Sequence, residues 1–157
     1  MIERYSRKEL KDIWSEENKY KIWLEVEIAA AEAMEKFKII PKGVSSIVKK
    51  KGKIKVKRIH DIEAKVKHDV IAFLTSITEQ AGIKARYLHQ GMTSSDVLDT
   101  SFNIQLMQSG KIILKDIDKI LIVLKRQAKK YKMTPCIGRS HGIHAEPITF
   151  GLKLASF

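Results

Sequence analysis

Apolar residues recur along most of this chain at the three- and four-residue spacing of an amphipathic helix, and strand-like alternation is nearly absent. The clearest case is a helix predicted from Ser15 to about Lys38, with Ser15 as its N-cap. Its apolar stripe, which we expect to be buried, consists of Tyr20, Leu24, Ile28, Ala31 and Met34. The pattern as a whole predicts an all-α fold.

Shorter amphipathic segments lie on both sides of that helix. Ser6 and Glu9 have the spacing of a capping box, which predicts a short helix through Trp14. Two further helices are predicted around residues 59–66 and 70–82, the second ending near Gly82. Their apolar positions are Ile59, Ile62, Val66, Val70, Ile71, Leu74 and Ile77.

The longest predicted element is a helix from Ser94 to Lys132. Gly110 is its only residue unfavourable to a helix, and it contains no proline. Such a helix spans about 55–60 Å, more than a small domain buries alone, so we expect a long helical bundle and an oligomer. Its predicted core positions are Val97, Phe102, Ile104, Ile113, Ile117, Ile120 and Leu124.

The last segment combines a polar loop with an apolar end. Pro135 ends the long helix, and residues 136–146 read as a loop. Pro147 suits the first position of a new helix that is still apolar at Phe157. A chain that stops on an uncapped apolar face is expected to be truncated.

The chain carries a net charge of +12, from 30 basic and 18 acidic residues. The basic residues are densest from Lys49 to Arg58, which is either a phosphate-binding patch or a solvated loop. No aromatic residue lies there to stack on nucleic-acid bases, so we favour the solvated loop and expect no nucleic-acid partner.

Other features point to a cytoplasmic protein. The chain has no apolar run of about 18 residues, so no membrane partner is expected. Its start lacks the apolar region of a signal peptide. Cys136 is the only cysteine among 157 residues, which excludes an intrachain disulfide.

Three polar segments next to helix starts could carry chemistry: residues 67–69, 89–96 and 139–146. Thr93 and Asp96 have capping-box spacing, and hydroxyls at a helix start also suit a carboxylate or phosphate. His141 and His144 match no zinc motif, so we expect no metal. Histidines in three such loops instead suggest proton transfer.

Four strings identify a family. The start MIERYSRKELKDIWSEENKYKIWLEVEIAAAEA, with KHDVIAF, HQGMTSSDVLDT and GRSHGIHAEPITFGLKLA, resembles bacterial adenylosuccinate lyases, members of the fumarase/aspartase superfamily. The resemblance implies residues 1–111 as an N-terminal helical domain and residues 112–157 as the truncated start of a central bundle. It also implies a cytoplasmic homotetramer of purine biosynthesis, with each active site built from three subunits.

The resemblance further implies an activity. Such enzymes eliminate fumarate from adenylosuccinate, giving AMP, and from SAICAR, giving AICAR, with no metal or organic cofactor. His141 corresponds to the general acid, and Arg4 and Tyr5 to positions that contact the nucleotide. The serine base of the family lies beyond Phe157, so the isolated chain is expected to be inactive.

The other carried-over positions bind substrate. His68 and Asp69 correspond to a substrate-binding segment, and Thr93 and Ser94 to a site for a succinyl carboxylate. His89 belongs to the same loop and is expected to support binding. Lys67 stands where the family commonly has arginine, which keeps the charge and loses the bidentate fork for phosphate.

Two alternatives stay open at this point. One is another lyase of the superfamily, such as argininosuccinate lyase or a cycloisomerase, against which the N-terminal string argues. The other is a basic helical protein that binds nucleic acid or acts as a scaffold, which predicts salt-sensitive binding to DNA or RNA.

Overall fold

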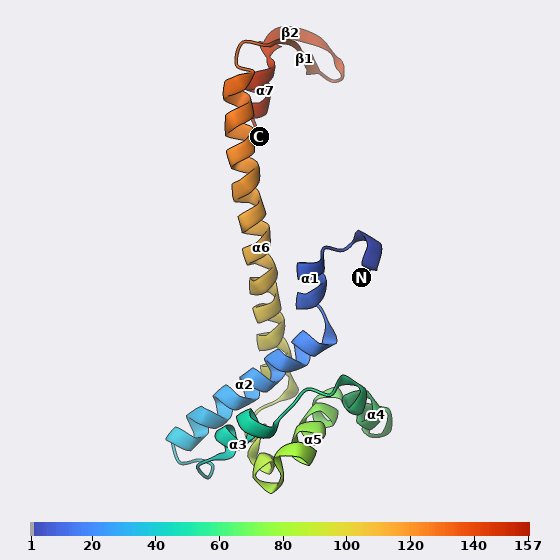
Figure 1. The fold of residues 1–157 in the computed structure, drawn as a ribbon, viewed down its shortest axis with the longest axis vertical. Helices are drawn as coiled ribbons and strands as arrows, with labels where there is room; N and C mark the ends of the chain where they lie inside the picture. The colour runs from blue at the N-terminus through green and yellow to red at the C-terminus, as the bar shows by residue number, and fades with distance from the viewer. Residues whose placement is uncertain (1) are drawn as a thin grey trace. The chain divides into compact units, whose positions relative to one another are not determined.

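The computed structural model describes residues 2–157, and these residues are mostly helical (Figure 1). The predicted all-α class is confirmed, with the addition of one small two-stranded sheet. Two compact units divide the chain, one reaching to Ser109 and the other running from Gly110 to Phe157. In chain order the elements are η1 (Glu3–Tyr5), α1 (Lys8–Ile13), α2 (Glu16–Lys36), α3 (Val44–Lys51), α4 (Val56–Val66), α5 (Asp69–Ala81), η2 (Ile83–Tyr87), α6 (Ser94–Lys130), β1 (Pro135–Ser140), β2 (Ile143–Thr149) and α7 (Phe150–Ala155).

The core of the first unit is centred on three aromatic rings from α2 and α5. Tyr20 stacks on Phe73 with ring centroids 5.9 Å apart, and Trp23 meets Phe73 edge-on at 5.5 Å. All three side chains are buried. Ser15 caps α2 as predicted, because its hydroxyl accepts the Asn18 N–H at 3.2 Å. These contacts fix α2 and α5, the helices that carry much of the polar site.

The lysine-rich stretch is not the single loop that was predicted. Helix α3 extends through Lys51 and α4 begins at Val56, so residues 52–55 alone connect them. The helical periodicity there comes from Val44 and Val48, one turn apart and fully buried. The lysines themselves are exposed, which confirms that they are solvated.

The predicted capping box at the start of the chain is wrong. The Ser6 hydroxyl donates to the Ile2 carbonyl oxygen at 2.8 Å and does not cap the helix. Helix α1 begins at Lys8, and Arg7 occupies its N-cap position without a side-chain cap. The Ser6 hydroxyl is therefore bonded within the 3-10 turn that precedes α1, and it is not available to cap that helix.

The long helix is confirmed from Ser94 to Lys130, but most of its predicted core positions are not buried within the single chain. Val97 is buried, whereas the other apolar residues of the predicted stripe lie from half-buried to exposed. Exposures are 50% at Phe102, 52% at Ile113, 46% at Ile117 and 57% at Ile120. An apolar helical stripe is buried only when a second helix packs on it. Within residues 2–157, no helix is both long and apolar enough to cross a membrane.

The segment after α6 is a β-hairpin, where a loop and a helix starting at Pro147 were predicted. Strands β1 and β2 are antiparallel, and Pro147 pairs with Ile137 inside the ladder. The turn between them consists of His141 and Gly142, with φ of +50° and +80°. Two consecutive positive φ values are typical of two-residue hairpin turns, so this turn defines the hairpin. Helix α7 begins only at Phe150, where the Thr149 hydroxyl accepts the Leu152 N–H.

Candidate active site

The connection between α4 and α5 consists of two of the predicted substrate-binding residues. Lys67 ends α4 in the left-handed conformation with φ of +57°, and His68 is the N-cap of α5. His68 Nδ1 accepts the Ile71 N–H at 3.4 Å, which leaves Nε2 to carry the ring proton of the neutral form. Both side chains are exposed, so a cation and an imidazole donor lie together at a helix start.

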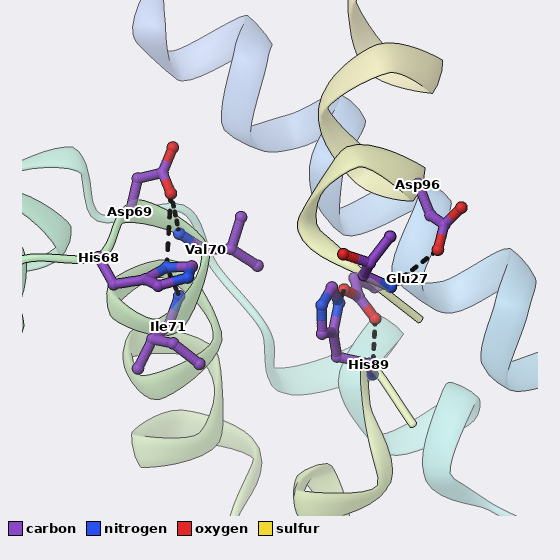
Figure 2. A network of polar contacts seen from close by, with 8 residues as sticks. Glu27, His68, Asp69, Val70, Ile71, His89 and Asp96 are labelled. Carbon is purple, nitrogen blue, oxygen red and sulfur yellow. Dashed lines mark hydrogen bonds and ion pairs between the residues drawn. The ribbon is translucent and has the colours of Figure 1, made fainter. Parts of the chain in front are cut away.

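Asp69 occupies the first position of the same helix. Its Oδ1 accepts the Val70 N–H at 2.7 Å and lies 3.5 Å from His68 Nδ1 (Figure 2). The predicted pair of His68 and Asp69 is therefore held by the first turn of α5. The carboxylate is stabilised there by the positive end of the helix.

His89 forms the most buried polar contact of the predicted site. Its Nδ1 lies 2.6 Å from Glu27 Oε1, and its backbone N–H donates to Glu27 Oε2 at 2.8 Å. The Glu27 side chain is fully buried and the His89 side chain is 16% exposed. Figure 2 shows the imidazole ring against this carboxylate, which α2 supplies.

Glu27 was missed by the sequence analysis, although the sequence carries a signal for it. It lies seven residues after Tyr20 and directly before Ile28, both on the predicted buried stripe. A charged residue on a buried helical face needs a partner, because an unpaired buried charge is costly. The spacing shows that Glu27 is buried, but not which residue pairs with it.

The start of α6 contains Thr93 and Ser94. The Asp96 carboxylate accepts the Thr93 N–H at 2.8 Å, which confirms the carboxylate half of the predicted capping box. Thr93 is exposed and Ser94 half-buried. Hydroxyls and N–H groups thus meet at the positive end of a 37-residue helix, an arrangement that suits an anion.

His141 belongs to the second unit, at the tip of the hairpin. Both His141 and His144 are exposed, and Arg139 donates from Nη1 to the Gly142 carbonyl oxygen at 3.1 Å. This bond closes the turn under His141. The imidazole is therefore on a short turn that a hydrogen bond closes, and the ring itself is accessible to a reacting group.

The remaining predicted residues lie near the start of the chain. The Arg4 guanidinium lies over the Tyr5 ring at 4.7 Å from its centroid, within η1. Tyr5 is 74% exposed, so its ring is available to a ligand. Among residues 2–157, no group of three or more histidine, cysteine or acidic side chains is placed to hold a metal ion.

Three curated proteins similar to this chain are adenylosuccinate lyases. The adenylosuccinate lyase of Thermotoga maritima is 48% identical over 154 residues, which is 98% of this chain and 36% of the relative. That of Synechocystis sp. is also 48% identical, over the whole chain and 36% of its own length. That of Bacillus subtilis is 44% identical over 99% of the chain and again 36% of the relative. The chain therefore spans about a third of the length of these relatives.

Solved structures and a family profile extend the comparison. A fumarate lyase from Mesorhizobium sp. BNC1 matches 94% of this chain with a TM-score of 0.87 and 27% identity, over 36% of its own chain. The beta-carboxy-cis,cis-muconate cycloisomerase of Acinetobacter calcoaceticus sp. ADP1 matches 96% with a TM-score of 0.84 and 25% identity, over 37% of its own chain. The sequence profile of the lyase family matches residues 3–157, nearly the entire chain, and this chain therefore belongs to the lyase family.

Proposed function

We propose that this chain supplies part of the active site of an adenylosuccinate lyase. The observation that carries the proposal is the 48% identity to the Thermotoga maritima enzyme over 98% of the chain. The fumarate lyase and the cycloisomerase have the same fold but share only 27% and 25% of the sequence. Because a substrate site depends on particular side chains more than on the fold, the higher identity favours adenylosuccinate as the substrate.

The proposed reaction is a β-elimination that releases fumarate from adenylosuccinate, leaving AMP, and from SAICAR, leaving AICAR. A base removes the proton from the carbon next to a carboxylate. The carbon–nitrogen bond then breaks, its electrons stay on nitrogen, and an acid protonates that nitrogen. We assign the acid to His141, since an imidazole exchanges protons near neutral pH and this ring is exposed on a stapled turn.

The other residues are assigned to binding the anionic groups of the substrate. Thr93 and Ser94 would hold a succinyl carboxylate at the positive end of α6. Lys67 and His68 would meet the phosphate at the α4–α5 turn, with Asp69 stabilising that turn. Arg4 and Tyr5 would contact the nucleotide. His89 would support substrate binding.

The proposal includes an assembly. In it, residues 1–111 form an N-terminal helical domain, residues 112–157 begin a central bundle, and four copies form a cytoplasmic homotetramer of purine biosynthesis. Support comes from the exposed apolar side chains of α6, among them Ile113, Ile117 and Ile120. The chain spans 36% of the length of the Thermotoga maritima relative. We therefore assign the other catalytic groups to segments that correspond to the remaining part of that relative.

The test is a chimera in which residues 1–157 replace the matching segment of the Thermotoga maritima enzyme. We expect the folded chimera to release fumarate from adenylosuccinate and SAICAR, and the 157-residue chain alone to release none. Argininosuccinate and carboxymuconate are offered in parallel. A folded tetrameric chimera that acts only on one of these would overturn the proposal.

His141 is tested in the same chimera. His141→Ala is expected to lower kcat about 100-fold or more, the usual loss for an acid–base group. His144→Ala is the matched control, because His144 is an exposed histidine on the same hairpin and no role is assigned to it. Near-normal turnover in the first variant, or an equal loss in both, would remove His141 from the mechanism.

A further inference from the structure

Glu27 is a fully buried carboxylate that bonds twice to one distant residue. Its Oε2 accepts the His89 backbone N–H at 2.8 Å, and its Oε1 lies 2.6 Å from His89 Nδ1. The two residues are 62 positions apart, on α2 and in the segment between η2 and α6. A buried carboxylate is stable only when its oxygens are hydrogen-bonded, so this geometry commits Glu27 to His89.

The backbone of His89 is held in an uncommon conformation. Its φ is +62°, in the left-handed region that residues other than glycine rarely adopt outside turns. The His89 carbonyl oxygen accepts the Met92 N–H at 3.3 Å, which forms the turn leading to Thr93. The bond from the His89 N–H to Glu27 therefore supports the turn that places the start of α6.

The ring contact also fixes which nitrogen faces outward. A carboxylate accepts hydrogen bonds, so we assign the proton of this contact to His89 Nδ1, which faces Glu27 Oε1. Nε2, on the far side of the ring, is then the nitrogen left for a ligand. It donates to an anion when both ring nitrogens carry a proton, with the Glu27 carboxylate balancing the positive charge of the ring. A histidine whose one nitrogen is fixed by a carboxylate presents the other nitrogen in a defined orientation and proton state.

We propose that Glu27 is a positioning residue, which fixes His89 through its backbone and Nδ1 so that the Nε2–H of the doubly protonated ring donates to an anionic group of the substrate. This inference rests on the proposed lyase function for the identity of that substrate. The contact itself lies within the first unit and requires no partner chain.

The first test is nitrogen-15 NMR of the histidine rings in the 157-residue chain, with His89 assigned by its loss in His89→Gln. We expect a proton on Nδ1 of His89. In Glu27→Gln the amide oxygen can still accept the His89 N–H, but the amide NH2 faces Nδ1, so the ring should keep a proton on Nε2 alone and lose the charged form that the anion binds. A wild-type ring with Nδ1 unprotonated would overturn the proposal, and this reading needs no enzymatic activity and no variant of Glu27.

The second test is kinetic, in the chimera. Glu27→Gln is expected to raise KM for adenylosuccinate about tenfold with a smaller change in kcat, as for a lost binding interaction. In a double-mutant cycle, adding Glu27→Gln to His89→Gln should change KM no further, because both act through one contact. Additive losses would mean that Glu27 acts on overall structure and would contradict the proposal.

Glu35→Gln is the matched control, since Glu35 is also on α2 and also binds backbone N–H groups of another segment, but contacts no histidine. It should leave KM and kcat at wild-type values. A chimera that is folded but inactive towards adenylosuccinate would count against the lyase function, whereas an active chimera with unchanged KM in Glu27→Gln counts against the positioning role alone.

Discussion

The backbone of Gly151 lies against the carbonyl oxygen of Ala128, so closely that a Cβ on Gly151 would be 2.5 Å from that oxygen. The Gly151 N–H also donates to the Tyr131 carbonyl oxygen at 2.9 Å, so α7 is bonded to the residue that directly follows α6. A glycine is therefore required where the two backbones meet, within the second unit.

Gly151→Ala is accordingly expected to loosen α7. The added methyl cannot be accommodated by a side-chain movement, because its nearest neighbours are backbone atoms, and such overpacking costs about 1–3 kcal/mol. Amide hydrogen exchange of residues 150–157 should become about tenfold faster or more. Gly110→Ala is the control, since nothing lies within 4 Å of its Cβ and alanine stabilises a helix interior by about 0.5–1 kcal/mol. Faster exchange around Gly110 in that variant would contradict this explanation.

Tyr20 makes the stability of the first unit sensitive to alkaline pH. Burial, followed by the nearby charges of Glu16, Glu63 and Asp69, raises the pKa of Tyr20 from 10.0 to about 12. The folded state holds this proton more tightly than the unfolded state, so the contribution is complete below pH 10 and is lost as pH rises towards 12.

Tyr20→Phe removes that titration. Between pH 8 and pH 11, the free energy of unfolding of the wild type should fall by about 1 kcal/mol more than that of Tyr20→Phe. Urea denaturation followed by circular dichroism measures both. Equal losses in the two chains would show that the buried hydroxyl of Tyr20 does not contribute.

Glu35 stabilises the start of α3 and should do so only above acid pH. Its oxygens accept the Ser45 N–H at 2.7 Å and the Gly43 N–H at 3.1 Å. The bond from the Ser45 N–H is the main cause that lowers the pKa of Glu35 below its ordinary value of 4.5. The folded state therefore favours the ionised form, and its contribution is lost as pH falls through that lowered pKa.

Glu35→Gln is expected to cost about 1.5–3 kcal/mol of unfolding free energy at pH 7, the range for hydrogen bonds to a charged group. Below pH 4.5 the difference between wild type and variant should shrink. Denaturation at pH 7 and pH 3.5 gives the comparison. A difference that is constant over this range would mean that the carboxylate charge has no part in capping α3.

Lys67 is expected to lower the stability of the fold while it strengthens substrate binding. Its φ of +57° is a position where glycine is preferred, so Lys67→Gly should raise the unfolding free energy by about 1 kcal/mol. In the chimera the same variant should raise KM for adenylosuccinate, because the cation at the α4–α5 turn is lost. Lys65→Gly, inside the last turn of α4, should instead cost about 1 kcal/mol and keep KM. Equal destabilisation by Lys67→Gly and Lys65→Gly would show that the positive φ of Lys67 does not destabilise the fold.

Local sequence signals predicted the helices well and the strands poorly. Ser15 and the apolar spacing behind it were sufficient to place α2, since capping and periodicity are properties of neighbouring residues. The hairpin was missed because its strands are mostly exposed and lack an alternating apolar face. Its defining feature is the pair of positive φ values at His141 and Gly142, which no composition signal marked.

The sequence by itself determined the helical class, the long α6, the family resemblance and the residues proposed for the site, because each depends on short segments or on matching strings. The tertiary structure alone decided which residues face one another. Glu27 meets His89, 62 residues further along the chain, and Glu35 meets Ser45 across the connection from α2 to α3, only after these segments have packed. A buried carboxylate must be paired, but its spacing within one helix carries no information about the segment that supplies the partner.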